Sequence, residues 1–207
     1  MIGHVLVTLE ILLVVVMPLL FLYLRGRWPL RTIVPCLLIL PVLWYFTYAP
    51  LHELSHVLGT YAVGGKVTSI RLLPSFWLGE FGGAWITPAG LTNSWQQLIM
   101  TSSPYLLDVL SVVAGMVFLR RDFSENPFVI GLALTLLCTR PAFDLLCETI
   151  AFLIGFRGDL YHIKLIIGSF VTWSLLLASI GLSLVAILVV VRRFGGPERF
   201  LPVEAST

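Results

Sequence analysis

Five long apolar segments fill most of this chain, and they constrain its fold more than any other feature. They cover approximately residues 2–24, 32–63, 94–119, 127–155 and 161–191. A helix needs about 20 predominantly apolar residues to cross the hydrocarbon core of a bilayer. Only 12% of the residues are charged, against roughly 25% in soluble domains. We therefore expect an all-α polytopic membrane protein with about five transmembrane helices.

These segments are expected to form a single membrane domain over residues 1–207, surrounded by the lipid bilayer. Segment 2–24 lacks a basic stretch before it and a small-residue cleavage site after it, so we expect a retained helix and not a signal peptide. The net charge of +2 comes from scattered basic residues, which argues against a nucleic-acid partner. Cys36, Cys138 and Cys147 lie in apolar runs without metal-ligand spacing, and we expect small buried hydrophobic residues there.

Basic residues cluster at three places between or after the apolar segments. The clusters are Arg25, Arg27 and Arg31; Arg120 and Arg121; and Arg192, Arg193 and Arg199. With five spans the three clusters fall on one side of the membrane, which the positive-inside rule makes cytoplasmic. The N-terminus is then expected outside and the C-terminus in the cytoplasm.

The connection over residues 64–92 differs from the apolar segments. Gly64-Gly65 is suited to end the second helix, because glycine readily adopts the left-handed cap conformation. Residues 66–73 are rich in β-branched and aliphatic side chains, and residues 84–87 form a possible return strand. We expect a short β-hairpin or re-entrant loop at the membrane surface, with an irregular loop anchored by aromatic residues as the alternative.

The second apolar segment contains the sequence His52-Glu53-Leu54-Ser55-His56. Residues four apart lie on one face of a helix, so the rings of His52 and His56 are able to bind a single metal ion. Glu53 lies beside that face, where it can accept a proton from a water at the metal without binding the metal itself. Ionisable residues inside apolar spans are functional candidates by default. A pair of hydrogen-bonded interfacial histidines is the alternative.

A catalytic zinc site needs a third protein ligand and one open position. His4 and His162 lie near span ends, so the candidates within the spans are Asp108, Asp144 and Glu148. A rise of about 1.5 Å per residue puts Asp144 at a depth similar to that of the two histidines and puts Asp108 nearer the cytoplasmic face. This comparison favours Asp144 and leaves Glu148, one turn further along, as an alternative.

Arg140 and Pro141 lie just before Asp144 in the fourth segment. A proline inside a helix removes one hydrogen bond and can re-aim the side chains that follow. A charged side chain within a span is expensive unless it is paired. We expect Arg140 to pair with Asp108 or Glu148, or to lie at a wet cavity and hold a substrate carbonyl.

Over roughly residues 41–155 the chain resembles the three-helix core of site-2-protease-like intramembrane zinc metalloproteases. The resemblance rests on residues 52–56 followed by Gly64-Gly65, on Ser103-Pro104 followed by Asp108, and on residues 140–144. Arg140 stands where that family usually has asparagine, and Leu145 stands where it usually has glycine. Segments 2–24 and 161–191 would be additional helices outside this core.

The resemblance implies a zinc metalloendopeptidase that hydrolyses a peptide bond in or near a transmembrane segment of a substrate protein. In that reading Zn²⁺ is held by His52, His56 and Asp144, and Glu53 is the catalytic proton acceptor. Two other readings remain open. One is a catalytically inactive relative that binds membrane partners, and the other is a metal carrier, which a single unrepeated motif fits less well.

Overall fold

The computed structural model describes residues 29–74, 83–120 and 126–195, together with separate positions between 4 and 20. In chain order its elements are η1 (Leu12–Val16), α3 (Leu30–Ala62), β1 (Lys66–Arg71), β2 (Trp85–Ala89), α4 (Ser94–Arg120), α5 (Pro127–Ala133), η3 (Leu134–Thr139), α6 (Arg140–Leu153), α7 (Asp159–Ile167) and α8 (Ser169–Gly195), where η denotes a π-helix. The expected helical fold is therefore confirmed for the described part of the chain.

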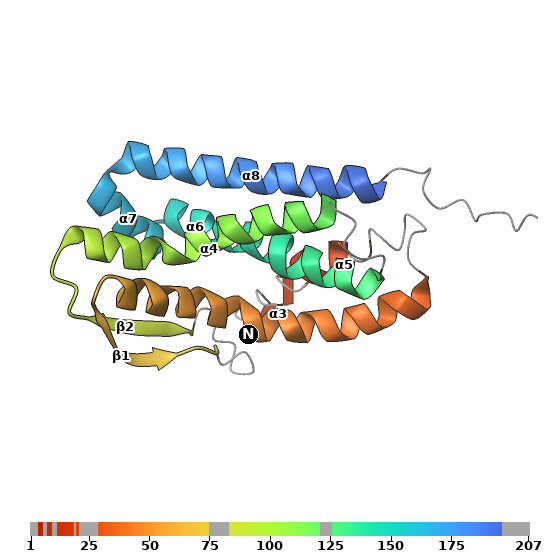
Figure 1. The fold of residues 1–207 in the computed structure, drawn as a ribbon, viewed down its shortest axis with the longest axis horizontal. Helices are drawn as coiled ribbons and strands as arrows, with labels where there is room; N and C mark the ends of the chain where they lie inside the picture. The colour runs from red at the N-terminus through yellow and green to blue at the C-terminus, as the bar shows by residue number, and fades with distance from the viewer. Residues whose placement is uncertain are drawn as a thin grey trace, which may run out of the picture.

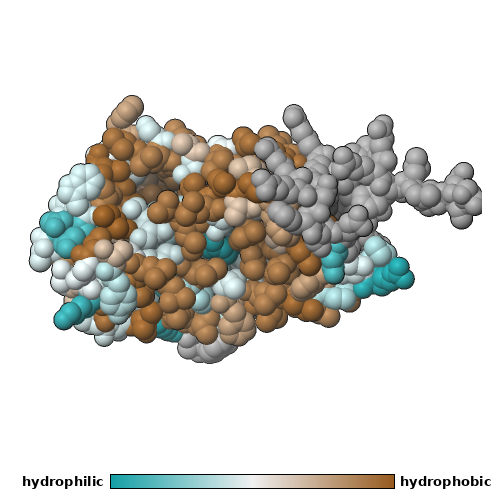
Figure 2. Space-filling model, viewed as in Figure 1, coloured by the Kyte–Doolittle hydropathy of each residue, from teal (hydrophilic) through white to brown (hydrophobic). Residues whose placement is uncertain are grey.

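Four helical stretches of the described residues are long and apolar enough to cross a membrane. They are Leu30–Ala62, Ser94–Leu119, Phe128–Leu153 and Ser169–Ala186. Many of their large apolar side chains point outward, and Leu58 and Phe170 are 70% and 84% exposed. Apolar residues cover most of the face in Figure 2, whereas hydrophilic ones gather towards its two ends. The chain is a membrane protein. The expected span at 2–24 is described only at separate positions, and about half of it lies outside the described residues.

The long helices run roughly along one axis, with α3 at one edge, α8 at the other and α4 between them (Figure 1). Helix α4 is central to the arrangement, since it packs against α3, α6, α7 and α8. The start of α3, the start of α5 and the end of α8 lie at one end of the molecule, and the hairpin and α7 lie at the other (Figure 1). The basic clusters of the sequence therefore border elements that meet at the same end.

The fifth expected segment, residues 161–191, is divided into two helices. Gly168 adopts a φ of +83° between α7 and α8, a left-handed conformation that a continuous right-handed helix cannot contain. Within this segment, the described residues that qualify as a membrane span are Ser169–Ala186. The preceding α7 is a separate helix of nine residues that begins at Asp159, two residues before the expected segment.

The connection between α3 and α4 contains the expected hairpin. Strands β1 and β2 pair antiparallel, from Lys66 opposite Ala89 to Arg71 opposite Trp85, with a register irregularity between Val67 and Ser69. Helix α3 ends just before Gly64, whose φ is +80°, as expected for a left-handed helix end. The hairpin lies against the end of α3 that follows the histidine motif (Figure 1).

The fourth segment is a single helical rod made of α5, η3 and α6. The π-helix η3 ends at Thr139, and α6 begins with Arg140 and Pro141. Wide π turns are often found at functional sites and beside prolines that interrupt regular helix hydrogen bonding. Buried side chains of α3 and η3 form part of the core at this level, including Cys36 and Cys138. Cys36 and Cys138 are buried, Cys147 is half-buried, and no disulfide joins any two of these three cysteines.

Candidate metal centre

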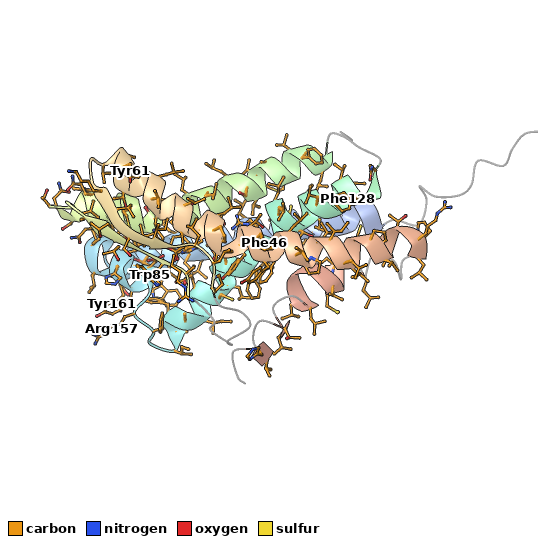
Figure 3. All side chains as sticks on the ribbon, turned by 90° about the horizontal axis from the view of Figure 1, so that it is seen from below. Phe46, Tyr61, Trp85, Phe128, Arg157 and Tyr161 are labelled. Atoms are coloured by element: carbon orange, nitrogen blue, oxygen red, sulfur yellow. The ribbon has the colours of Figure 1, made fainter. Side chains whose placement is uncertain are left out.

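Two histidines of α3 and an aspartate of α7 converge at the hairpin end of the bundle. The Nε2 atoms of His52 and His56 lie 3.3 Å and 2.9 Å from Oδ2 of Asp159. The three ligand atoms all lie within 4.8 Å of one another. Figure 3 places Arg157 and Tyr161, the neighbours of Asp159 in sequence, at the same end as Trp85 of the hairpin.

The start of α7 positions Asp159. Gly158 precedes the helix in an extended conformation, and Asp159 lies in the first turn, where the helix dipole favours a negative charge. Burial alone raises the pKa of Asp159, but hydrogen bonds to His52 and His56 and their charge outweigh it and hold the pKa below its ordinary value. Asp159 is therefore an anionic ligand at neutral pH.

The donor set fits a zinc ion. Zinc binds imidazole nitrogen and carboxylate oxygen at about 2.0–2.2 Å in a tetrahedron, so its ligand atoms lie about 3.3 Å from one another. The distances from Oδ2 of Asp159 to Nε2 of His52 and of His56, 3.3 Å and 2.9 Å, are close to this edge length. Three protein ligands also leave one tetrahedral position open, as catalytic zinc sites do.

A backbone carbonyl of α4 orients the ring of His56. Nδ1 of His56 lies 2.9 Å from the carbonyl oxygen of Met100. In a regular helix that oxygen accepts from the N–H four residues later, but residue 104 is a proline inside α4, which has no N–H to donate. The free carbonyl fixes Nδ1–H as the donor and leaves Nε2 available to a metal.

A carboxylate orients the ring of His52. Oδ2 of Asp144 lies 2.9 Å from Nδ1 of His52, and the Asp144 side chain is 4% exposed. A hydrogen bond from Nδ1–H to a carboxylate makes Nε2 the metal-binding nitrogen and increases its basicity. The two histidines thus direct the same ring atom, Nε2, towards Asp159, although one is oriented by a side chain and the other by the backbone.

Glu53 lies beside these ligands but is not one of them. It is 9% exposed, and it interacts electrostatically with His52, His56, Asp159 and Asp144. A buried carboxylate next to the open position of a metal centre is suited to accept a proton from a water molecule. The expected role of Glu53 as the proton acceptor stays a prediction.

The structure places the three acids considered as the third ligand in different roles. Asp144 reaches His52, as its depth suggested, but on the Nδ1 side of the ring. Asp108 pairs with Arg140, Oδ1 to Nη2, at 2.9 Å. Glu148 accepts a hydrogen bond from the Tyr105 hydroxyl at 3.2 Å. The group of ligand atoms within 4.8 Å contains Asp159 instead, which the sequence reasoning missed.

The sequence carries one signal for Asp159. It stands directly after Gly158 in a break between two apolar stretches, four residues beyond Gly155 with its φ of +85°. An aspartate after such a break can occupy the first turn of a helix. A search for ligands restricted to the spans does not include this position, because it lies between two of them.

Comparison with protein-family models, with curated proteins and with solved structures gives no match to this chain. The fold and site therefore define a helical membrane protein with a candidate His–His–Asp metal centre, and its function is inferred from that geometry.

Proposed function

We propose that this chain is an intramembrane zinc metalloprotease that hydrolyses a peptide bond in or near a transmembrane segment of a substrate protein. One observation carries the proposal: His52, His56 and Asp159 converge beside the buried carboxylate of Glu53, within a membrane protein. Two neutral imidazoles and a carboxylate with a nearby acid are the parts of a zinc hydrolase.

The residues have distinct roles in this proposal. His52, His56 and Asp159 hold the ion, and Asp144 and the Met100 carbonyl keep the two imidazoles turned towards it. When bound, zinc would polarise the scissile carbonyl and make a water molecule more acidic. Glu53 would accept the proton of that water and deliver it to the leaving amine.

Asp144 as the third metal ligand remains a second assignment, as the resemblance to site-2-protease-like enzymes implies. Its contact with Nδ1 of His52 favours an orienting role. The contacts of Asp159 with Nε2 of both histidines favour Asp159 as the ligand. The zinc content of Asp159→Asn compared with that of Asp144→Asn separates the two assignments.

The hairpin is proposed to hold the substrate. A helical substrate must unwind before its backbone can be attacked, and an exposed strand edge can bind the extended segment. Strands β1 and β2 lie at the end of α3 that follows the histidine motif. Proline substitutions within residues 66–73 should reduce cleavage, and undiminished cleavage would contradict this step.

The orientation in the membrane follows the basic clusters. We propose five spans, with the first at residues 2–24, the N-terminus outside and the three arginine clusters on the cytoplasmic side. The metal centre then lies in the non-cytoplasmic half of the bilayer. Accessibility labelling of cysteines introduced at either end of α8 tests this arrangement, and a C-terminus accessible only from outside would contradict it.

Measurement of bound zinc and peptide cleavage on the same samples tests the proposed function. The purified full chain in lipid nanodiscs is loaded with zinc and incubated with a set of transmembrane peptides, and products are identified by mass spectrometry. Wild type should bind one zinc and cleave, whereas Glu53→Gln should bind zinc without cleaving. Ser179→Ala is a matched control, since this exposed α8 hydroxyl only bonds Leu175 of its own helix. It should behave as wild type.

The other two readings predict different results. A wild type that binds no zinc would contradict the enzyme proposal, and an inactive relative would bind partners without cleaving any peptide. A metal carrier would move zinc across vesicle membranes, and that flux would persist in Glu53→Gln.

A further inference from the structure

A buried ion pair joins α4 to α6 near the metal centre. Nη2 of Arg140 lies 2.9 Å from Oδ1 of Asp108, and each side chain is 1% exposed. Both residues lie within membrane-spanning helices, where an unpaired charge would be costly. A buried pair contributes little net stability once desolvation is included, so helix association alone is a weak reason for its presence.

The ion pair is connected to His52 through Asp144. Arg140 and Asp144 are four apart at the start of α6 and therefore lie on one face, a turn from one another. Asp144 contacts Nδ1 of His52 at 2.9 Å. Asp108 interacts electrostatically with both Asp144 and His52, and Asp144 interacts with Arg140. A buried polar chain thus runs from Arg140 through Asp108 and Asp144 to a metal-binding ring.

The interactions among Arg140, Asp108 and Asp144 explain how the Asp144 carboxylate is held in place. Asp108 and Asp144 are two buried carboxyl groups whose side chains are hydrogen-bonded to one another, which requires a proton between the two oxygens. Arg140 fixes Asp108 by one oxygen and attracts Asp144 along the same helix face. Asp108 therefore links Arg140 to Asp144.

We propose that Arg140 and Asp108 are positioning residues for the metal centre, which hold the Asp144 carboxylate against Nδ1 of His52 and thereby keep Nε2 directed to zinc. This inference rests on the metal site of the proposed function. It predicts that the pair controls zinc affinity although neither residue touches the ion. Outer partners of metal-binding histidines typically change metal affinity by 10- to 100-fold, approximately.

The central test uses the double variant Arg140→Met/Asp108→Asn, which removes both charges and leaves no unpaired ion in the membrane. Zinc affinity is measured by chelator competition on the full chain in nanodiscs. In parallel, the Nδ1–H proton resonance of His52 in the metal-free protein reports its hydrogen bond to Asp144, assigned by its loss in His52→Gln. We expect zinc binding weakened about tenfold and a His52 Nδ1–H that has lost this hydrogen bond.

Two further variants separate positioning from packing. Arg140→Lys keeps a cation opposite Asp108 and should retain most of the zinc affinity and the His52–Asp144 hydrogen bond. Gly115→Ala disturbs the neighbouring α4–η3 contact without changing charge, since its Cβ would lie 2.7 Å from Sγ of Cys138. Gly115→Ala should lower thermal stability but leave the His52–Asp144 hydrogen bond as in wild type.

The outcomes are distinguishable from those of the proposed function. A wild type without zinc would contradict the metal site itself. A wild type that binds zinc, with a folded double variant of equal affinity and an unchanged His52–Asp144 hydrogen bond, would overturn only the positioning role. An equal loss of that hydrogen bond in Gly115→Ala would also overturn it, because packing alone would then explain the effect.

Discussion

Nδ1 of His56 lies 2.9 Å from the carbonyl oxygen of Met100, an oxygen that its own helix leaves free because of Pro104. A proline that interrupts α4 thus leaves a hydrogen-bond acceptor for His56, a histidine of the candidate metal centre on α3. The same residue that weakens one helix orients a side chain of another.

Pro104→Ala should therefore improve the helix and impair the site. The new N–H can bond to the Met100 carbonyl, and alanine is favoured over proline inside a helix by about 3 kcal/mol. We expect zinc binding about tenfold weaker with an unchanged or raised unfolding temperature. Pro35→Ala is the matched control, since Pro35 also lies inside a helix but at the start of α3, far from the histidines. Equal zinc affinity in Pro104→Ala and wild type would contradict this account of His56.

The two aspartates near the histidines should differ in their effect on zinc. Asp159→Asn removes a ligand charge from the group at Nε2, so we expect near-complete loss of bound zinc. Asp144→Asn removes only the acceptor at Nδ1 of His52, so we expect affinity reduced by about 10- to 100-fold with one zinc still bound. Metal analysis after dialysis measures both. The reverse order of effects would assign Asp144 as the ligand.

Helices α3 and α4 approach closely at Gly59, and a larger residue there should disturb the centre. A Cβ on Gly59 would lie 3.0 Å from the Met100 backbone and would clash with the Ser103 hydroxyl. Gly59→Ala should destabilise the protein by about 1–3 kcal/mol and weaken zinc binding through the His56–Met100 contact. Gly181→Ala, where nothing lies within 4 Å of the new Cβ, should be neutral or stabilising. Similar behaviour of the two variants would refute the close approach.

Zinc affinity should fall as the pH is lowered. Protons compete with the metal for both imidazoles, and metal ligands must be deprotonated to bind. The pKa of Asp159 is already held below its ordinary value, so this carboxylate adds no competition near neutral pH. We expect zinc affinity to decrease as the pH is lowered from 8 to 5, with up to two protons taken up per zinc released. Chelator competition from pH 5 to 8 measures this, and a flat profile would exclude histidine ligands.

Periodic features of the site were predictable from the sequence. The spacing of His52 and His56 is set by the helix repeat, and counting residues placed Asp144 at the right depth to contact His52. The hairpin was signalled by glycines around β-branched residues, and it forms between Lys66 and Ala89. Each of these depends on local geometry that the sequence determines directly.

Long-range placement was not predictable in the same way. Asp159 reaches the histidines because α6 ends and α7 turns back, and this path depends on Gly155 and Gly168 with positive φ. Apolar residues continue on both sides of Gly168, so composition alone suggests one span. The partner of Arg140 was left open between Asp108 and Glu148, because helix rotation decides which acid it meets, and packing selects Asp108.

X-ray absorption at the zinc edge of the purified full chain tests the central claim most directly. The account predicts one bound zinc with two imidazole nitrogens and carboxylate oxygen at about 2.0–2.2 Å, and loss of the imidazole signal in the double variant His52→Gln/His56→Gln. A protein that retains no zinc, or a zinc with sulfur ligands from its free cysteines, would contradict it.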